Sequence, residues 1–217
     1  VRTEIGKKIR EAFKAGKGKM LISADYSQFE LRLAAALAGD EELVELFNQD
    51  ADIHTATAAQ VYDIAPHEVT PDRRRYAKVI NFGILYGMSP HGLSVATGMS
   101  EAEAKEFVSK YKELRKPIFD YTQSLIDKAN KDGYVETLFG RRRPMPDIKS
   151  SNYIVRSAAE RAAKQLLQIH DSIIVECEEK DAKKIEKMMV ETMENIYSKL
   201  PVKLKVDVKS GYNWGEL

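Results

Sequence analysis

The sequence predicts an α+β protein: a small antiparallel sheet with helices, built from both ends of the chain, and a mainly helical segment inserted between them. Three observations support this prediction. Short apolar or alternating runs typical of strands lie near the ends, at residues 19–25, 166–177 and 202–208. Apolar residues at helical spacing dominate the middle, and no repeat or low-complexity linker interrupts it. We therefore expect one subdomain of residues 1–30 and 166–217 and a second of residues 31–165.

The first part of the chain alternates between helix and strand patterns. A helix pattern over the first residues is broken by Gly16 and Gly18, and the apolar run that follows ends on the carboxylate Asp25. The expected elements are, in order, a helix over residues 4–15, a strand over 19–25, and helices over 30–38 and 41–48.

Helix start and stop signals divide the middle of the chain. Thr70-Pro71 has the chemistry of an N-cap and first helical residue, and predicts a long helix to about Tyr86. Ser100 with Glu103 has the pattern of a capping box. The remaining expected elements are a helix from Pro117 to Asp132, a strand over 134–138, a basic loop over 140–144, a strand-turn-strand over 166–177, an amphipathic helix over 181–199 and a strand over 202–208.

Composition sets broad limits on function. The chain has 217 residues with 34 Lys plus Arg against 33 Asp plus Glu, so its net charge of +1 neither favours nor excludes a nucleic acid. The basic residues are clustered, which is what a polyanionic partner requires. The single cysteine, Cys177, cannot form an internal disulfide; we expect it to be buried, in a cytoplasmic, reducing setting. No apolar run approaches the ~20 residues that span a bilayer, so no membrane association is expected.

Two aspartates occupy positions suited to metal chemistry. Asp25 ends one apolar strand, and Asp171 lies at the turn of a separate predicted hairpin. Carboxylates at neighbouring strand ends can hold two hard divalent cations, which stabilise the attacking and leaving oxygens of a phosphoryl displacement. Aspartates at strand ends are also common turn formers, and spacing alone leaves both interpretations open.

The helix after Thr70 carries a second pattern. Arg74, Lys78 and Phe82 recur every fourth residue, so two cations and an aromatic ring share one helical face. Cations can hold a triphosphate, and a flat ring can stack on a nucleobase. The alternative is a solvated basic face beside a core aromatic side chain.

These residues lie in three motifs that resemble those of the family A DNA polymerases. Residues 25–32, Asp-Tyr-Ser-Gln-Phe-Glu-Leu-Arg, are similar to motif A (D-Y-S-Q-I-E-L-R). Residues 74–87 resemble motif B (R-x3-K-x3-F-G-x2-Y-G), and residues 168–171, Gln-Ile-His-Asp, resemble motif C. Residues 52–55 and 133–146 resemble segments between motifs A and C. The resemblance covers essentially the whole chain in the family's order.

The resemblance implies roles for individual residues. Template-directed transfer of a dNMP to a primer 3′-hydroxyl would use Asp25, Asp171 and Lys78. Two Mg²⁺ ions, or Mn²⁺ in their place, would be held by Asp25, Asp171 and the backbone carbonyl of Tyr26. Glu30 would lie under the sugar C2′ and exclude a 2′-hydroxyl. Contacts to the incoming dNTP are implied for Arg74, Lys78, Phe82, Tyr86, Glu30, His54 and Gln28, and contacts to primer-template DNA for Arg2, Arg161, Gln168 and His170.

The same resemblance identifies the first subdomain as a palm and the second as fingers. Thumb and exonuclease domains are expected in a longer parent protein, which would act in DNA replication or repair. Two alternatives remain: a nucleic-acid or nucleotide-binding remnant that no longer polymerises, and a single-subunit RNA polymerase. The four residues Asp25, Asp171, Arg74 and Lys78 argue against the first. Glu30 and Phe82 argue against the second, which typically has Tyr at the position of Phe82.

The chain departs from the family pattern in two places. Ser172 stands where the family usually has Glu, directly after Asp171. A segment of roughly thirty residues, which begins N-x-P-x-Q-G and continues as a long helix, is missing between Ala163 and Leu166. We expect this join to uncover apolar residues of 166–175 and 202–208. A covalently continuous join predicts little or no polymerase activity of this chain alone.

Overall fold

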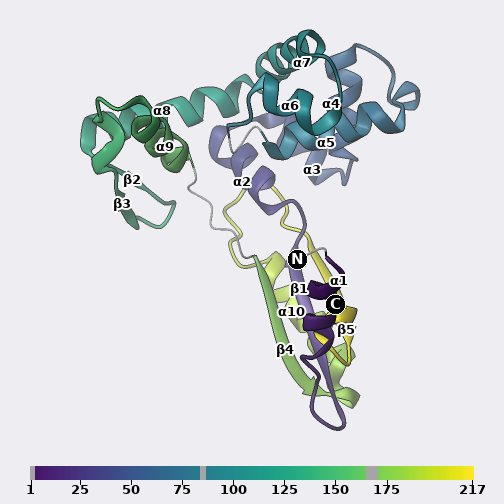
Figure 1. The fold of residues 1–217 in the computed structure, drawn as a ribbon. Coiled ribbons are helices and arrows are strands. Elements are labelled where there is room, and N and C mark those ends of the chain that lie inside the picture. The colour runs from purple at the N-terminus through teal and green to yellow at the C-terminus, as the bar shows by residue number, and fades with distance from the viewer. Residues whose placement is uncertain (1–2, 84–86, 165–170) are drawn as a thin grey trace. The chain divides into compact units, whose positions relative to one another are not determined.

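The computed structural model describes residues 3–83, 87–164 and 171–217. The chain divides into two compact units, one formed by Val1–Phe29 with Ile169–Leu217 and the other by Glu30–Gln168. The predicted α+β class is confirmed, since a small antiparallel sheet lies in the first unit and helices dominate the second (Figure 1). Among the described residues, no helix is long and apolar enough to cross a membrane.

The first unit is built around a three-stranded antiparallel sheet. Its strand order is β4-β1-β5, so the early strand lies between two late ones. Its elements are α1 (Glu4–Glu11), β1 (Lys19–Tyr26), β4 (Ser172–Glu178), the short 3-10 helix η4 (Glu179–Asp181), α10 (Ala182–Glu194), β5 (Val206–Gly211) and the 3-10 helix η5 (Trp214–Glu216).

One face of this sheet packs against α10. Ile22 and Ala24 of β1 are fully buried against Met189 and Met193 of the helix. Cys177 of β4, a free cysteine, is buried in the same cluster, as predicted. Because side chains alternate along a strand, Asp25 points to the face away from α10.

Three predicted boundaries in this unit are wrong. The first helix ends at Glu11 instead of 15, because Lys14 and Ala15 pair with the C-terminal segment at Asn213 and Tyr212. The last helix covers only 182–194 of the expected 181–199. The final strand is Val206–Gly211 instead of 202–208. The first strand of the hairpin predicted over 166–177 lies largely outside the described residues.

The second unit is mainly helical. Its elements are α2 (Phe29–Ala38), α3 (Glu41–Asn48), α4 (Ile53–Tyr62), η1 (Pro66–Glu68), α5 (Pro71–Gly83), α6 (Pro90–Thr97), α7 (Glu101–Leu114), α8 (Lys116–Asp132), β2 (Tyr134–Glu136), β3 (Arg142–Pro144), η3 (Pro146–Lys149) and α9 (Tyr153–Lys164). A core shared by α4, α5, α6 and α7 includes the fully buried Ala58, Ile80 and Tyr111.

Local sequence signals explain several ends of these helices. Ser100 accepts a hydrogen bond from the backbone N–H of Glu103, whose carboxylate accepts one from the Ser100 N–H, so the predicted capping box is confirmed. Gly133 ends α8 at φ +79°, a left-handed conformation that glycine adopts without steric cost. The basic loop expected over 140–144 is wrong in part, because Arg142–Pro144 pairs with β2 as a strand. Arg142 is bound to Glu136 at 2.7 Å.

A buried polar cluster joins α8 to α3 and α4. The fully buried guanidinium of Arg115 donates to Asp40 at 3.5 Å, to Glu42 at 3.1 Å and to the side-chain oxygen of Gln60 at 3.0 Å. A buried cation is tolerated only when such acceptors surround it. The cluster therefore fixes these three helices of the second unit against one another.

Candidate active site

The two predicted metal-binding aspartates meet at one end of the β4-β1 pair. Asp25 lies near the end of β1, and Asp171 directly precedes β4. The carboxyl of Asp171 lies close enough to that of Asp25 to affect its ionisation. The backbone N–H of Tyr26 also lies 3.4 Å from the carbonyl oxygen of Asp171, so main-chain pairing holds both residues.

Partial burial and neighbouring negative charge raise the pKa of Asp25. Burial is the largest cause, the carboxyl of Asp171 is the next, and that of Asp207 adds to it. A carboxylate that is disfavoured by its neighbours gains from a cation placed between them. The oxygen-only donor set at this strand end therefore suits a hard divalent ion.

Asp207 is a residue of this site that was not among the sequence-based predictions. Asp25 pairs across the sheet with Ser172 on β4 and with Asp207 on β5. Directly opposed residues of antiparallel strands point to the same face, so Asp207 lies beside Asp25 on the face away from α10. The alternation of residues 202–208 already placed Asp207 on the polar face of a strand, and that was the available signal. No group of three or more His, Cys, Asp or Glu within the described ranges has the geometry of a metal site.

Tyr26 and Gln28 follow Asp25 at the end of the strand. The Tyr26 ring stacks on Phe29 at 4.7 Å, and its hydroxyl donates to the Met193 carbonyl at 2.7 Å, which anchors this corner to α10. Gln28 has φ +54°, a conformation that a non-glycine residue adopts at a cost. Its side-chain oxygen is buried without a hydrogen-bond partner among the described residues.

In the second unit, Arg74 of α5 is held by Asp52, the N-cap residue of α4. The Arg74 Nε donates to one carboxylate oxygen at 2.7 Å and a terminal nitrogen donates to the other at 3.2 Å. Asp52 also accepts from the backbone N–H groups of His54 and Thr55. Although burial opposes it, these hydrogen bonds from Arg74 and Thr55 lower the pKa of Asp52 to about 2.

His54 and Phe82 lie beside this ion pair. The His54 side chain is buried, and its ring centroid is 5.7 Å from that of Phe82. Burial lowers the pKa of His54 to about 4, and the positive charges of Arg74 and Lys78 act in the same direction against the opposing effect of Asp52. Lys78 is exposed and forms no ion pair with any residue the structure describes. The predicted face of α5 thus brings two cations, a neutral imidazole and an aromatic ring together.

Two further predicted residues of this unit are described. Glu30 lies half-buried in the first turn of α2. Arg161 of α9 is exposed, donates to the Ser157 hydroxyl at 2.7 Å, and has its aliphatic stem against Gly87. Arg2, Tyr86, Gln168 and His170 lie outside the described residues, and so does the join at Leu166.

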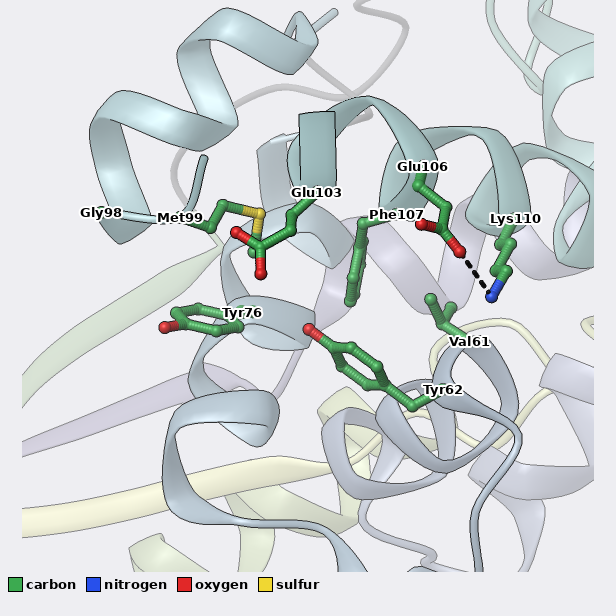
Figure 2. Close-up of a pocket in the computed structure, with 9 residues that line it drawn as sticks. All are labelled: Val61, Tyr62, Tyr76, Gly98, Met99, Glu103, Glu106, Phe107 and Lys110. Atoms are coloured by element: carbon green, nitrogen blue, oxygen red, sulfur yellow. Dashed lines mark ion pairs between the residues drawn. The ribbon is translucent and has the colours of Figure 1, made fainter. Parts of the chain in front are cut away.

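A separate hollow of about 430 Å³ lies between α4, α5 and α7 (Figure 2). Tyr62 packs edge-on against Phe107 at 5.4 Å on its wall, and Glu106 pairs with Lys110 at 2.9 Å. Tyr76, which also lines it, is two residues after Arg74 and so lies roughly 200° around α5 from it. Of the predicted nucleotide-binding residues that the structure describes, none lines this hollow.

Comparison with known proteins identifies the class to which this fold and these motifs belong. The chain belongs to DNA polymerase family A, and the sequence model of that family matches residues 1–165 and 162–216. It is 40% identical to the thermostable DNA polymerase I of Thermus filiformis, covering 100% of this chain and 29% of that protein. It is 39% identical to DNA polymerase I of Bacillus subtilis (strain 168), covering 99% of this chain and 28% of that protein.

A solved structure agrees with this family membership. The POL domain of Pol1 from M. smegmatis, in complex with DNA primer-template and dNTP, is 36% identical and superposes with a TM-score of 0.86. The match covers 100% of this chain and 44% of that chain. The chain therefore spans less than a third of the length of the two curated relatives and less than half of the solved one.

The comparisons also locate the missing segment. The alignments run over 245 and 246 positions, whereas the chain has 217 residues, so the relatives carry additional residues within the matched region. The family match is split into two parts that meet at residues 162–165. This places the additional residues of the relatives at the C-terminal end of α9, next to the expected gap.

The expected loss of packing next to this gap is found on one strand only. Ile173 and Ile174 of β4 are 50% and 42% exposed. The expectation is wrong for residues 202–208, because Val202, Leu204 and Val206 are buried. Val206 belongs to the cluster with α10, which supplies the cover that we assigned to the missing segment.

Proposed function

We propose that the chain carries the catalytic portion of a DNA-directed DNA polymerase that transfers a dNMP from a dNTP to a primer 3′-hydroxyl. The observation that carries the proposal is the closeness of the Asp25 and Asp171 carboxyls at neighbouring strand ends, in a chain that belongs to DNA polymerase family A. The unit of residues 1–29 and 169–217 would be the palm, and the unit of residues 30–168 the fingers.

Asp25 and Asp171, with the backbone carbonyl of Tyr26, would hold two Mg²⁺ ions, for which Mn²⁺ could substitute. Such ions, when bound, stabilise the charge on the attacking and leaving oxygens of a phosphoryl displacement. The raised pKa of Asp25 supports this assignment, since burial and then the neighbouring carboxyl of Asp171 disfavour the ionised form of Asp25, which a bound cation would favour. Asp207 would add negative charge on the same face, on the opposite side of Asp25 from Ser172, which stands where the family usually has Glu.

The fingers residues would bind the incoming nucleotide. Arg74 and Lys78 would hold the triphosphate, with His54 as a neutral donor beside them. Phe82 would present its ring to the base and sugar, and Tyr86 of the fingers and Gln28 of the palm would complete the contacts. Glu30 would exclude a ribose 2′-hydroxyl by its bulk. The 2.7 Å contact with Asp52 supports the role of Arg74, because it fixes the guanidinium before a nucleotide arrives.

Partners follow from the same assignment. Primer-template DNA would contact Arg2, Arg161, Gln168 and His170. Thumb and exonuclease domains would belong to a longer parent protein, consistent with the partial coverage of the relatives. The parent would act in DNA replication or repair inside the cell, where the single free thiol of Cys177 stays reduced.

The shortened join supports a second candidate for this chain alone: a module that binds nucleotide and DNA but extends primers poorly. Primer extension with labelled primer-template, Mg²⁺ and the four dNTPs distinguishes the two. The chain is compared with a chimera in which the aligned extra residues of Bacillus subtilis DNA polymerase I are inserted between Ala163 and Leu166. We expect extension by the chimera, abolished by Asp25→Asn, and little by the chain itself. A folded chimera that binds DNA and dNTP but never extends a primer would overturn the polymerase proposal.

A further inference from the structure

A buried amide lies directly behind the imidazole of His54. Asn81 on α5 is 1% exposed, and its side-chain nitrogen lies 3.2 Å from Nδ1 of His54 on α4. The same nitrogen lies 3.1 Å from the hydroxyl oxygen of Thr57, which is fully buried one turn after His54. The amide therefore bridges two side chains of α4 across its contact with α5.

This arrangement determines which ring nitrogen carries the proton. An amide nitrogen has two hydrogens and no free lone pair, so it can only donate. Its two hydrogens are directed to Nδ1 of His54 and to the oxygen of Thr57. Nδ1 must then accept, and a neutral imidazole that accepts at Nδ1 carries its single proton on Nε2. Nε2 has no hydrogen-bond partner in the described part of the chain, so its proton is available to a ligand.

The charges around the ring explain why a neutral donor is useful here. Arg74, paired with Asp52, and Lys78 already place two cations at this face, and a third charge on a buried ring would be repelled by both. Neutral imidazole could offer its N–H from either nitrogen. The amide nitrogen of Asn81 can only donate to Nδ1, so it removes this choice and fixes the ring orientation at no cost in charge.

We propose that Asn81, anchored by Thr57, is a positioning residue that holds His54 as the Nε2–H tautomer, so that the ring donates one directed hydrogen bond to a phosphate oxygen of the incoming nucleotide. This inference rests on the proposed function for its ligand, but not for the tautomer. Asn81 touches no substrate in this arrangement; it acts through His54.

The first test needs no nucleotide. The full chain is labelled with ¹⁵N-histidine, and the two ring nitrogens of each of its four histidines are observed by long-range ¹H–¹⁵N correlation at pH 7, with His54 assigned from the His54→Gln variant. We expect His54 to be neutral with its proton on Nε2. In Asn81→Asp the isosteric carboxylate can only accept, so the proton should move to Nδ1 or the ring should become charged. Asn130→Asp, the same change on α8 of the same unit, should leave His54 unchanged. A proton on Nδ1 in the unmodified chain would overturn the proposal.

The second test measures the consequence for the ligand. Binding of dATP with Mg²⁺, and of inorganic triphosphate alone, is measured by calorimetry on the same variants. Asn81→Asp should weaken both about tenfold, whereas Asn130→Asp should not change them, and Thr57→Val should give an intermediate loss. Equal affinity of Asn81→Asp and the unmodified chain for both probes would overturn the positioning role. Absence of any binding by the unmodified chain would instead overturn the proposed nucleotide site, and the NMR result would still decide the tautomer.

Discussion

The guanidinium of Arg74 is held at two points by the carboxylate of Asp52, at 2.7 and 3.2 Å, before any ligand is present. The same carboxylate caps α4, where it accepts hydrogen bonds from the backbone N–H groups of His54 and Thr55. Asp52 thus orders both the start of α4 and the Arg74 side chain of α5. This coupling places Arg74 and His54 in fixed positions relative to each other.

The Arg74–Asp52 pair should be visible as an unusually acidic carboxyl. Asp52 has a pKa of about 2, so it should remain ionised at pH 3.5–4, where ordinary aspartates take up protons. Its contribution to stability is present above the ordinary pKa of 3.8 and is lost as the pH falls through about 2. A ¹³C-detected carboxyl titration should show Arg74→Ala returning the Asp52 pKa toward its ordinary value. Arg73→Ala, whose guanidinium lies over Tyr62, is the matched control. An unshifted Asp52 in Arg74→Ala would contradict the prediction.

His54 should make the chain sensitive to mild acid. Its pKa is lowered from 6.5 to about 4 in the folded state, so the unfolded chain binds the proton more readily. Stability should be full above pH 6.5 and fall as the pH drops toward 4, by up to about 3 kcal/mol if each pKa unit is worth ~1.4 kcal/mol. Urea unfolding from pH 7 to 4.5 measures this. The His54→Gln variant should lose less stability over that interval than the unmodified chain, and equal slopes would contradict the assignment.

Asp25→Asn and Asp171→Asn should separate function from stability. Each amide keeps the side-chain shape but removes charge that divalent cations need. Manganese binding, followed by electron paramagnetic resonance, should be lost, and so should primer extension in any form of the chain that extends primers. Because the two carboxyls repel each other, each variant should melt at a temperature no lower than that of the unmodified chain. Retained Mn²⁺ binding in both variants would remove the metal assignment.

Lys78→Ala should reduce turnover with dNTP more than it weakens primer-template binding. A lysine on the transferring phosphates stabilises charge that grows in the transition state. We expect a loss of at least tenfold in turnover by the active chimera, with DNA affinity changed less than threefold. Lys105→Ala, an exposed lysine of α7, is the control. A parallel fall in DNA affinity and turnover would assign Lys78 to the DNA-binding surface instead.

Glu30→Gly should raise incorporation of ribonucleotides relative to deoxynucleotides by the same chimera. If Glu30 discriminates by bulk, removing the side chain opens space for a 2′-hydroxyl. Glu30→Gln, which keeps the bulk and removes the charge, should preserve discrimination. Incorporation ratios measured on one template with matched rNTP and dNTP decide between bulk and charge, and an unchanged ratio in Glu30→Gly would exclude both roles.

Local signals predicted much of the fold, and contacts between distant residues account for the rest. The helix Glu41–Asn48 and the capping box at Ser100 follow from neighbouring residues alone, and both are found. The predicted final strand starts four residues too early, because residues 202–208 alternate as a strand does. Backbone pairing to β1 begins only at Val206, and no pattern within the segment encodes where its partner starts.

The residues of the candidate site divide in the same way, into those that local sequence patterns predict and those that only contacts between distant residues reveal. Arg74, Lys78 and Phe82 were found from their spacing, and Asp25 and Asp171 from their strand ends. Asp52, Asn81 and Asp207 were not singled out, because each acts through a residue distant in sequence. An N-cap aspartate, a buried helical asparagine and a strand aspartate are common features, and only the contacts with Arg74, His54 and Asp25 give them meaning.

The central position of β1 in the sheet affects the order in which the parts of the chain can fold. β1 pairs at Asp25 with Ser172 and Asp207, so its two neighbouring strands are synthesised only after all residues of the helical unit. Until then Ile22 and Ala24, fully buried in the finished structure, lack both their partner strands and the helix α10 that covers them. We expect the helical unit to fold first during synthesis, and the nascent β1 segment to be the stretch most in need of chaperone protection.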